Sequence, residues 1–229
     1  MDIRIFHLIE GAKQAEGLTV IIDVFRAASL ECYLYSMGVR EIRPVGTIGE
    51  AFSWRERDPA CILAGERGGR RCDGFDFGNS PSTVVPEAVY QKRIIHTTSA
   101  GTQGIINAEK ADELLLGSLV NASATARYIA GRKPEKVSLV CMGNAGVERN
   151  PEDELCAGYL KSMLTGEPMT DFKTRLSDLR FRGGEHFFIP EKQEIFPEAD
   201  FFMCIDHDRF DFVLKVGKDQ DGFVTRRVI

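Results

Sequence analysis

Apolar segments of strand length alternate with segments of helical pattern along most of this 229-residue chain. This alternation is typical of βαβ units, in which helices cover both faces of a mostly parallel sheet. We therefore predict an α/β fold, a three-layer α/β/α sandwich around a mostly parallel central sheet. The predicted strands are 19–24, 40–46, 61–66, 92–99, 112–118 and 136–143, and the predicted helices are 27–38, 47–57, 100–110, 121–131 and 150–164.

The pattern changes after residue 184. Segments 199–206, 211–217 and 222–228 resemble strands with no helices between them, so we expect them to add antiparallel strands that make the sheet mixed at its edge. No repeat, low-complexity tract or Pro/Ser-rich linker marks a boundary. Residues 1–229 are therefore predicted to form a single domain.

Charge and composition exclude several classes of protein. The net charge of −5 disfavours general affinity for nucleic acid, which needs a basic surface. No apolar run approaches the roughly 18 residues of a membrane helix, and the N-terminus lacks the features of a signal peptide, so we expect a cytoplasmic protein without membrane contact. The six cysteines form no CxxC pair and are predicted to be buried, reduced thiols rather than disulfides or metal ligands. A homo-oligomer is compatible with the sequence.

Polar segments follow four of the predicted strands. They are "DVFRAAS" (23–29), "GERGGRRCDGFDFGNSPS" (65–82), "HTTSAGTQG" (96–104) and "GNAGVERNPED" (143–153). In an open α/β sheet, ligands bind beyond the carboxyl ends of the strands. We therefore expect these four segments to meet at one edge of the sheet.

The first segment carries Asp23 and, one helical turn later, Arg26. A carboxylate at a strand end can hold Mg²⁺, which usually takes one or two protein carboxylates and leaves other positions to water and phosphate. The alternative is that Asp23 only caps the helix that follows.

The second segment is a long loop rich in glycine, which indicates either a working loop or a salt-bridged surface loop. Its acids suit a hard cation, and its arginines suit bidentate contacts to oxyanions. The candidate residues are Glu66, Arg67, Arg70, Asp76, Asn79 and Ser80.

The third segment closes a strand and opens a helix with small hydroxyl residues and glycines. Such residues let backbone N–H groups approach an anion, but they also serve as ordinary helix caps, and the sequence leaves both interpretations open. The candidate phosphate-binding residues are Thr97, Thr98, Ser99, Gly101 and Thr102. In the fourth segment, Glu152 and Asp153 are explained by a favourable interaction with a helix dipole. The four histidines give only weak functional signals.

Taken together, "VIIDVFRAAS", "GERGGRRCDGFDFGNSP", "TTSAGT", "GSLVNASA" and "NPEDELCAG" resemble the 2-phosphosulfolactate phosphatase family. The resemblance implies an α/β/α phosphomonoesterase that uses Mg²⁺ to hydrolyse 2-phosphosulfolactate to sulfolactate and phosphate, a step toward coenzyme M. Where the family usually reads close to T-N-G-T, this chain has Ser99, Ala100, Gly101 and Thr102.

The resemblance implies a role for each candidate residue. A small anionic phosphoester would be the substrate, and either a water activated by the metal or Asp23 itself would attack phosphorus. Two other classes stay open: a non-catalytic module that binds a phosphorylated metabolite, and a thiol-redox protein, which the cysteine spacing disfavours. The expected catalytic residues are Asp23, Arg26, Glu66 and Arg67; the metal ligands Asp23, Glu66 and Asp76; and the substrate-binding residues Arg70, Asn79, Ser80, Thr97, Thr98, Ser99, Gly101 and Thr102.

Overall fold

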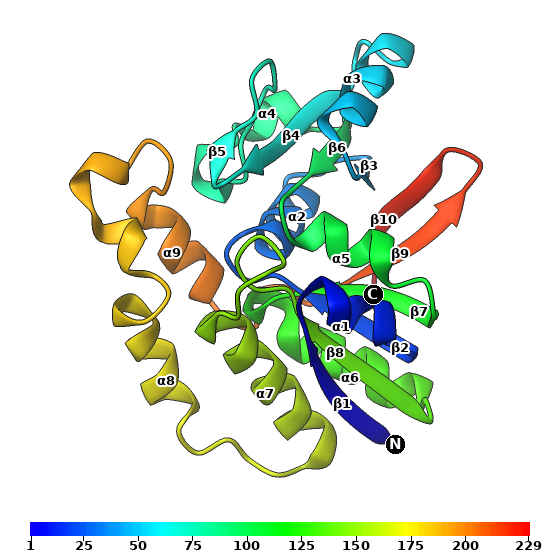
Figure 1. Cartoon of the computed structure of the whole chain (residues 1–229), viewed down its shortest axis with the longest axis vertical. Helices are drawn as coiled ribbons and strands as arrows, with labels where there is room; N and C mark the ends of the chain where they lie inside the picture. The colour runs from blue at the N-terminus through cyan, green and yellow to red at the C-terminus, as the bar shows by residue number, and fades with distance from the viewer.

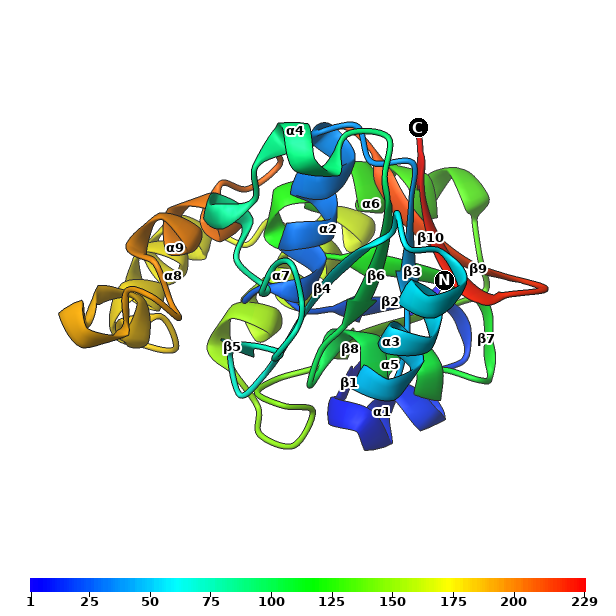
Figure 2. The same ribbon diagram turned by 90° about the horizontal axis from the view of Figure 1, so that it is seen from above.

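The computed structural model describes residues 1–229 and contains one ten-stranded sheet with helices on both faces (Figures 1 and 2). The strand order is β1-β8-β2-β7-β9-β10-β3-β6-β4-β5. The strands are β1 (Asp2–His7), β2 (Gly17–Ile22), β3 (Glu41–Pro44), β4 (Ile62–Arg67), β5 (Arg70–Arg71), β6 (Arg93–Thr97), β7 (Ala111–Gly117), β8 (Lys136–Cys141), β9 (Val213–Asp219) and β10 (Gly222–Val228).

The α-helices occupy the predicted positions and add four that the sequence pattern did not show, namely α1, α4, α8 and α9. They are α1 (Leu8–Gln14), α2 (Ala27–Ser36), α3 (Ile48–Arg57), α4 (Pro86–Val89), α5 (Gly101–Asn107), α6 (Ala122–Arg132), α7 (Pro151–Thr165), α8 (Phe172–Asp178) and α9 (Glu198–Ile205). Short 3₁₀ helices span Pro81–Thr83, Leu119–Asn121, Leu179–Phe181, Glu185–Phe188 and Pro190–Lys192.

The two-residue period of the buried strands builds the three layers. In β2, Leu18, Val20 and Ile22 face one apolar cluster and Ile21 faces the other, because successive side chains of a strand point to opposite faces. Helices α6 and α7 cover the first face, and α1, α2 and α5 cover the second. The α/β/α prediction is therefore confirmed.

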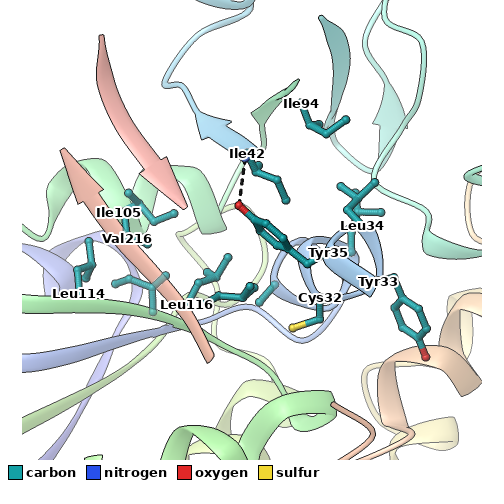
Figure 3. Packing of buried hydrophobic residues seen from close by; sticks show 14 of the residues in the cluster. Cys32, Tyr33, Leu34, Tyr35, Ile42, Ile94, Ile105, Leu114, Leu116 and Val216 are labelled. Carbon is teal, nitrogen blue, oxygen red and sulfur yellow. Dashed lines mark hydrogen bonds between the residues drawn. The ribbon is translucent and has the colours of Figure 1, made fainter. Parts of the chain in front are cut away.

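Helix α2 packs its buried face on the apolar cluster that contains Ile21. Figure 3 shows Tyr35 of α2 among the aliphatic side chains of that cluster. The backbone N–H of Ile42 donates a hydrogen bond of 3.2 Å to the Tyr35 hydroxyl. The same hydroxyl donates to the carbonyl of Thr225 in β10. Tyr35 thus ties α2 to β3 and to the C-terminal strand.

Two expectations for the C-terminal region were wrong. The β9–β10 hairpin is antiparallel as predicted, but it lies in the middle of the sheet, between β7 and β3, and only the short β5 makes an edge antiparallel. Segment 199–206 belongs to helix α9 rather than to a strand. Its buried residues Asp200, Phe201 and Cys204 follow a helical spacing, which a short apolar run does not distinguish from a strand pattern.

All six cysteines are free and buried, which confirms the prediction of internal reduced thiols. No helix combines the length and the apolar character needed to cross a membrane.

Candidate active site

A cavity of about 390 Å³ opens at the carboxyl ends of β2, β4, β6 and β8. All four polar segments predicted from the sequence contribute to its wall, so the prediction that they meet is confirmed. A fifth segment, residues 183–196, closes the cavity from outside the sheet and is called the cover segment below. The residues that line the cavity and carry the argument are Asp23, Arg26, Glu66, Asn79, Ser99, Glu152, His186 and Lys192.

Asp23 lies in the wall, directly after β2. Its Oδ1 accepts a hydrogen bond from the backbone N–H of Ala27 at 3.1 Å, so it does cap α2. Burial, together with the carboxylates of Asp153 and Glu66, raises the pKa of Asp23 to about 7, against the lowering effect of backbone N–H groups. A side chain on residue 101 would collide here, because a Cβ at Gly101 would lie 2.8 Å from Oδ2 of Asp23.

Glu66, near the end of β4, organises two loops around the cavity. Its Oε1 accepts from the N–H of Ser99 at 2.7 Å, and its Oε2 accepts from the N–H of Gly69 at 2.7 Å and from the Ser99 hydroxyl at 3.3 Å. Glu66 therefore fixes the glycine-rich loop against the start of α5.

Two further carboxyl groups begin α7. Asp153 is buried and accepts from the N–H groups of Val24 and Gly143 at 2.8 and 2.9 Å, while burial raises its pKa to about 6. Glu152 is 2 % exposed, its Oε2 has no hydrogen-bond partner, and burial together with Asp153 raises its pKa well above the usual range. The sequence assigned both acids to the helix dipole, but Glu152 faces the cavity.

Arg26 reaches the cavity wall, and three hydrogen bonds tie its guanidinium to protein groups. Nη1 donates to Asp200 at 2.7 Å and to the carbonyl of Ile195 at 3.0 Å, and Nη2 donates to the carbonyl of Gly69 at 3.2 Å. Asp200 also accepts from Ser80. Arg26 thus ties α9, the cover segment and the glycine-rich loop together.

The cover segment supplies the positive and apolar side of the cavity. His186, Lys192 and the rings of Phe187 and Phe196 line it from here. Burial lowers the pKa of His186 to about 4, with Arg26 and Lys192 adding to the effect, so this imidazole is neutral at physiological pH. Lys192 forms no ion pair with a protein carboxylate, and it is the basic residue of this wall that is available to a ligand.

Several predicted site residues lie elsewhere. Asp76 is exposed, pairs with Arg55 and accepts from the N–H of Leu63 at 2.8 Å, so it anchors the loop to β4 rather than facing Asp23 and Glu66. Arg67 donates to the hydroxyl of Thr97 and to its neighbour's carbonyl, away from the cavity. Arg70 and Ser80 line a second, adjoining hollow on the outer side of the loop.

The threonines of the third segment serve the helix. The Thr98 hydroxyl accepts from the N–H of Thr102 at 3.1 Å, and the Thr102 hydroxyl accepts from the N–H of Thr98 at 2.8 Å. Both are buried. Of this segment, only Ser99 and Ala100 line the cavity, and Gly101 lies beside Asp23.

The cavity's donor chemistry fits Mg²⁺, although no three His, Cys, Asp or Glu side chains are arranged to hold a metal ion. Mg²⁺ is commonly bound by one or two carboxylates, with water and substrate phosphate completing the shell. Asp23 and Glu152 are buried acids whose pKa values are raised first by burial and next by neighbouring carboxylates, and Oε2 of Glu152 has no hydrogen-bond partner. A cation beside these acids would offset the repulsion between them.

The sequence reasoning missed Glu152, Asp200, His186 and Lys192. Glu152 could have been proposed from the sequence, because it lies in the fourth polar segment (143–153), but a favourable interaction with the helix dipole explained it equally well. The other three lie far along the chain, and only the packing of α9 and the cover segment brings them to the cavity.

An α/β sandwich with a charged cavity at the carboxyl ends of its strands defines the general class of α/β enzyme. Comparison with known proteins narrows this to the phosphoric monoester hydrolases. Residues 4–182 match the family described as 2-phosphosulpholactate phosphatase, and the chain belongs to that family.

Three relatives carry the description "probable 2-phosphosulfolactate phosphatase". The protein from Caldanaerobacter subterraneus subsp. tengcongensis is 33% identical over 227 residues, covering 92% of each chain. The protein from Bacillus subtilis is 28% identical over the full length of both chains. The protein from Caldicellulosiruptor saccharolyticus is 39% identical over 150 residues, which is 63% of this chain and 61% of that protein.

Proposed function

We propose that this protein hydrolyses 2-phosphosulfolactate to sulfolactate and phosphate with Mg²⁺, the reaction that leads toward coenzyme M. The observation that carries the proposal is the two-sided cavity. Asp23, Glu66 and Glu152 lie on the sheet side, and Lys192 and His186 lie on the cover side. A phosphoester that also carries a carboxylate and a sulfonate suits such a site, because a cation on one side and Lys192 on the other can each take an anionic group.

The acids of the cavity can take distinct roles in proton transfer. A pKa near 7 lets the Asp23 carboxylate accept a proton from the attacking water at neutral pH. Burial raises the pKa of Glu152, and in its protonated form this side chain can donate to the ester oxygen as the P–O bond breaks. The ester and one water thus become an alcohol and phosphate, with one proton taken up and one released.

Mg²⁺, when bound beside Asp23, would supply positive charge that offsets the charge on the phosphoryl group in the transition state. Glu66 keeps the Ser99 and Gly69 backbone in place, and the cover segment forms one wall of the cavity. A module that only bound a phosphometabolite would not need buried carboxylates beside the phosphate.

The specificity of this proposal can be tested with a substrate panel. We expect kcat/KM for 2-phosphosulfolactate to exceed that for phospholactate, a sugar phosphate and AMP under saturating Mg²⁺, because a site built for polar groups discriminates against analogues that lack them. Equal efficiency with AMP or the sugar phosphate would refute the polyanion substrate while leaving the phosphatase activity in place.

Replacement of Lys192 tests the positive side of the cavity. We expect Lys192→Ala to lower kcat/KM about 10-fold, mainly through KM, since a charge-assisted contact to the substrate is worth roughly 1.5 kcal/mol or more. Steady-state kinetics on 2-phosphosulfolactate measure this. The matched control is Lys173→Ala, which removes a lysine from a surface hollow beside α7 and α8. Equal kinetics for the two variants would show that Lys192 does not meet the substrate.

A further inference from the structure

A chain of three buried polar side chains runs from the core to the cavity wall. His96, in β6, is fully buried, and its Nδ1 lies 2.8 Å from Oε1 of Glu31 on α2. Its Nε2 lies 3.1 Å from Oδ1 of Asn79. Asn79 is 5 % exposed and lines the cavity. Neither Glu31 nor His96 touches the cavity itself.

Stability alone does not account for this arrangement. Glu31 and His96 lie among the apolar residues of the core; Leu30, Cys32 and Ile94, their neighbours in sequence, are fully buried. Taking two ionisable groups out of water costs several kcal/mol, and well-packed apolar residues are often as good or better for stability. Oε2 of Glu31 is also left without a partner. The desolvation of Glu31 and His96 therefore makes this pair unfavourable if its role is only structural.

The hydrogen bonds define the direction in which Asn79 points. Nδ1 of His96 faces the Glu31 carboxyl group, and Nε2 faces Oδ1 of Asn79. An amide oxygen only accepts, so Nε2 is the donor in the contact with Asn79. The amide nitrogen Nδ2 then turns away from His96, and it donates to no protein acceptor.

We propose that the Glu31–His96 pair is a positioning device that holds the Asn79 amide with its two N–H donors toward the cavity, where they bind an anionic oxygen of the phosphoester. This inference rests on the proposed function for its substrate. Without a proton on Nε2 of His96, the amide would turn over and present its carbonyl oxygen to an anion, which is repulsive. Glu31 acts through His96, and His96 acts through Asn79.

Kinetics of single and double variants test the dependence of one residue on the next. We expect Asn79→Ala to lower kcat/KM about 10- to 100-fold and Glu31→Gln to lower it in the same direction, because without the Glu31 carboxyl group the His96 ring is no longer held with Nε2 as the donor to Asn79. In the Asn79→Ala background, Glu31→Gln should have no further effect, since residues acting as one unit are not additive. A full additive loss in the double variant would overturn the proposal.

The matched control is Tyr35→Phe, which removes another buried hydroxyl from the same helix but does not reach the cavity. It should lower the Tm without lowering kcat/KM. If any of these variants unfolds, the ¹⁵N spectrum of the wild-type protein still tests the proposal, because it needs no substitution.

The ¹⁵N spectrum of the His96 ring in the wild-type protein at pH 7 reports its protons directly. A protonated Nε2 is expected, and an unprotonated Nε2 would overturn the proposal. Inorganic phosphate binding by calorimetry, weakened in Asn79→Ala, separates this inference from the proposed function. If the protein binds phosphate through Asn79 but hydrolyses no ester, the proposed activity is refuted and the positioning role of Glu31 and His96 stands. Phosphate binding unchanged by Asn79→Ala would refute the positioning role.

Discussion

Asp23→Asn is expected to abolish phosphoester hydrolysis and, in metal-free protein at pH 8, to raise the free energy of unfolding. The loss of activity follows because an amide neither accepts the proton of the attacking water nor offers a charged ligand to Mg²⁺. A loss of at least about 1,000-fold is expected, comparable to the removal of a principal catalytic group. A colorimetric assay of phosphate release measures it.

The gain in stability follows from the raised pKa of Asp23. Burial and the neighbouring acids move this pKa from 3.8 to about 7 in the folded protein. Between those values, the folded state keeps a proton that the unfolded state has lost, so the free energy of unfolding falls as the pH rises from about 4 to about 7. At about 1.36 kcal/mol for each pKa unit, the cost at pH 8 reaches about 4 kcal/mol at most.

Thermal unfolding in EDTA between pH 5 and pH 8 tests this prediction. The Tm of the wild-type protein should fall across this range more steeply than that of Asp23→Asn. Asp112→Asn is the matched control, because Asp112 is exposed in β7 and makes no hydrogen bond through its side chain. Parallel curves for wild type and Asp23→Asn would contradict the proposed electrostatics of the cavity.

The second large effect concerns the buried ion pair between Arg26 and Asp200. Asp200→Ala leaves the guanidinium of Arg26 buried without its carboxylate, and such a loss typically costs about 3–5 kcal/mol. Since native proteins are stable by only about 5–15 kcal/mol, this variant should be strongly destabilised. Urea unfolding followed by circular dichroism measures the difference.

A double variant separates the buried charge from a general loss of packing. Arg26→Met combined with Asp200→Ala should recover part of the stability, because no unpaired charge remains. Asp206→Ala is the control, since it breaks an exposed pair with Arg209 at 2.7 Å and should change the free energy of unfolding little. A double variant less stable than Asp200→Ala would show that the charges are not the cause.

Local sequence patterns predicted the sheet side of this molecule well. The alternation of strands and helices predicted β2, β4, β6 and β8 and the polar segments that follow them, and parallel pairing places the carboxyl ends of β2 and β8 side by side, and likewise those of β4 and β6. Three antiparallel pairings separate the two groups of strands, so the meeting of Asp23 with Glu66 and Ser99 also depends on how the two groups pack together. Helix caps were equally predictable: Thr47 and Glu50 form the capping box expected of their spacing.

Other parts of the site depend on contacts between residues distant in sequence. Lys192 and His186 reach the cavity only because Arg26 binds the carbonyl of Ile195 and the carboxylate of Asp200, and no local pattern encodes that contact. Asp76 was expected in the site because it shares a loop with Glu66, yet its carboxylate is held outside the cavity by Arg55 and by the backbone N–H of Leu63. The position of the β9–β10 hairpin likewise depends on pairing with β7 and β3.

The most direct test of the proposed activity is phosphate release from 2-phosphosulfolactate by metal-stripped protein, with and without added Mg²⁺, beside Asp23→Asn treated in the same way. Our account predicts no release from the stripped protein, restored turnover with Mg²⁺, and no turnover by Asp23→Asn in either condition. Full turnover by the metal-stripped protein, or by Asp23→Asn, would contradict it.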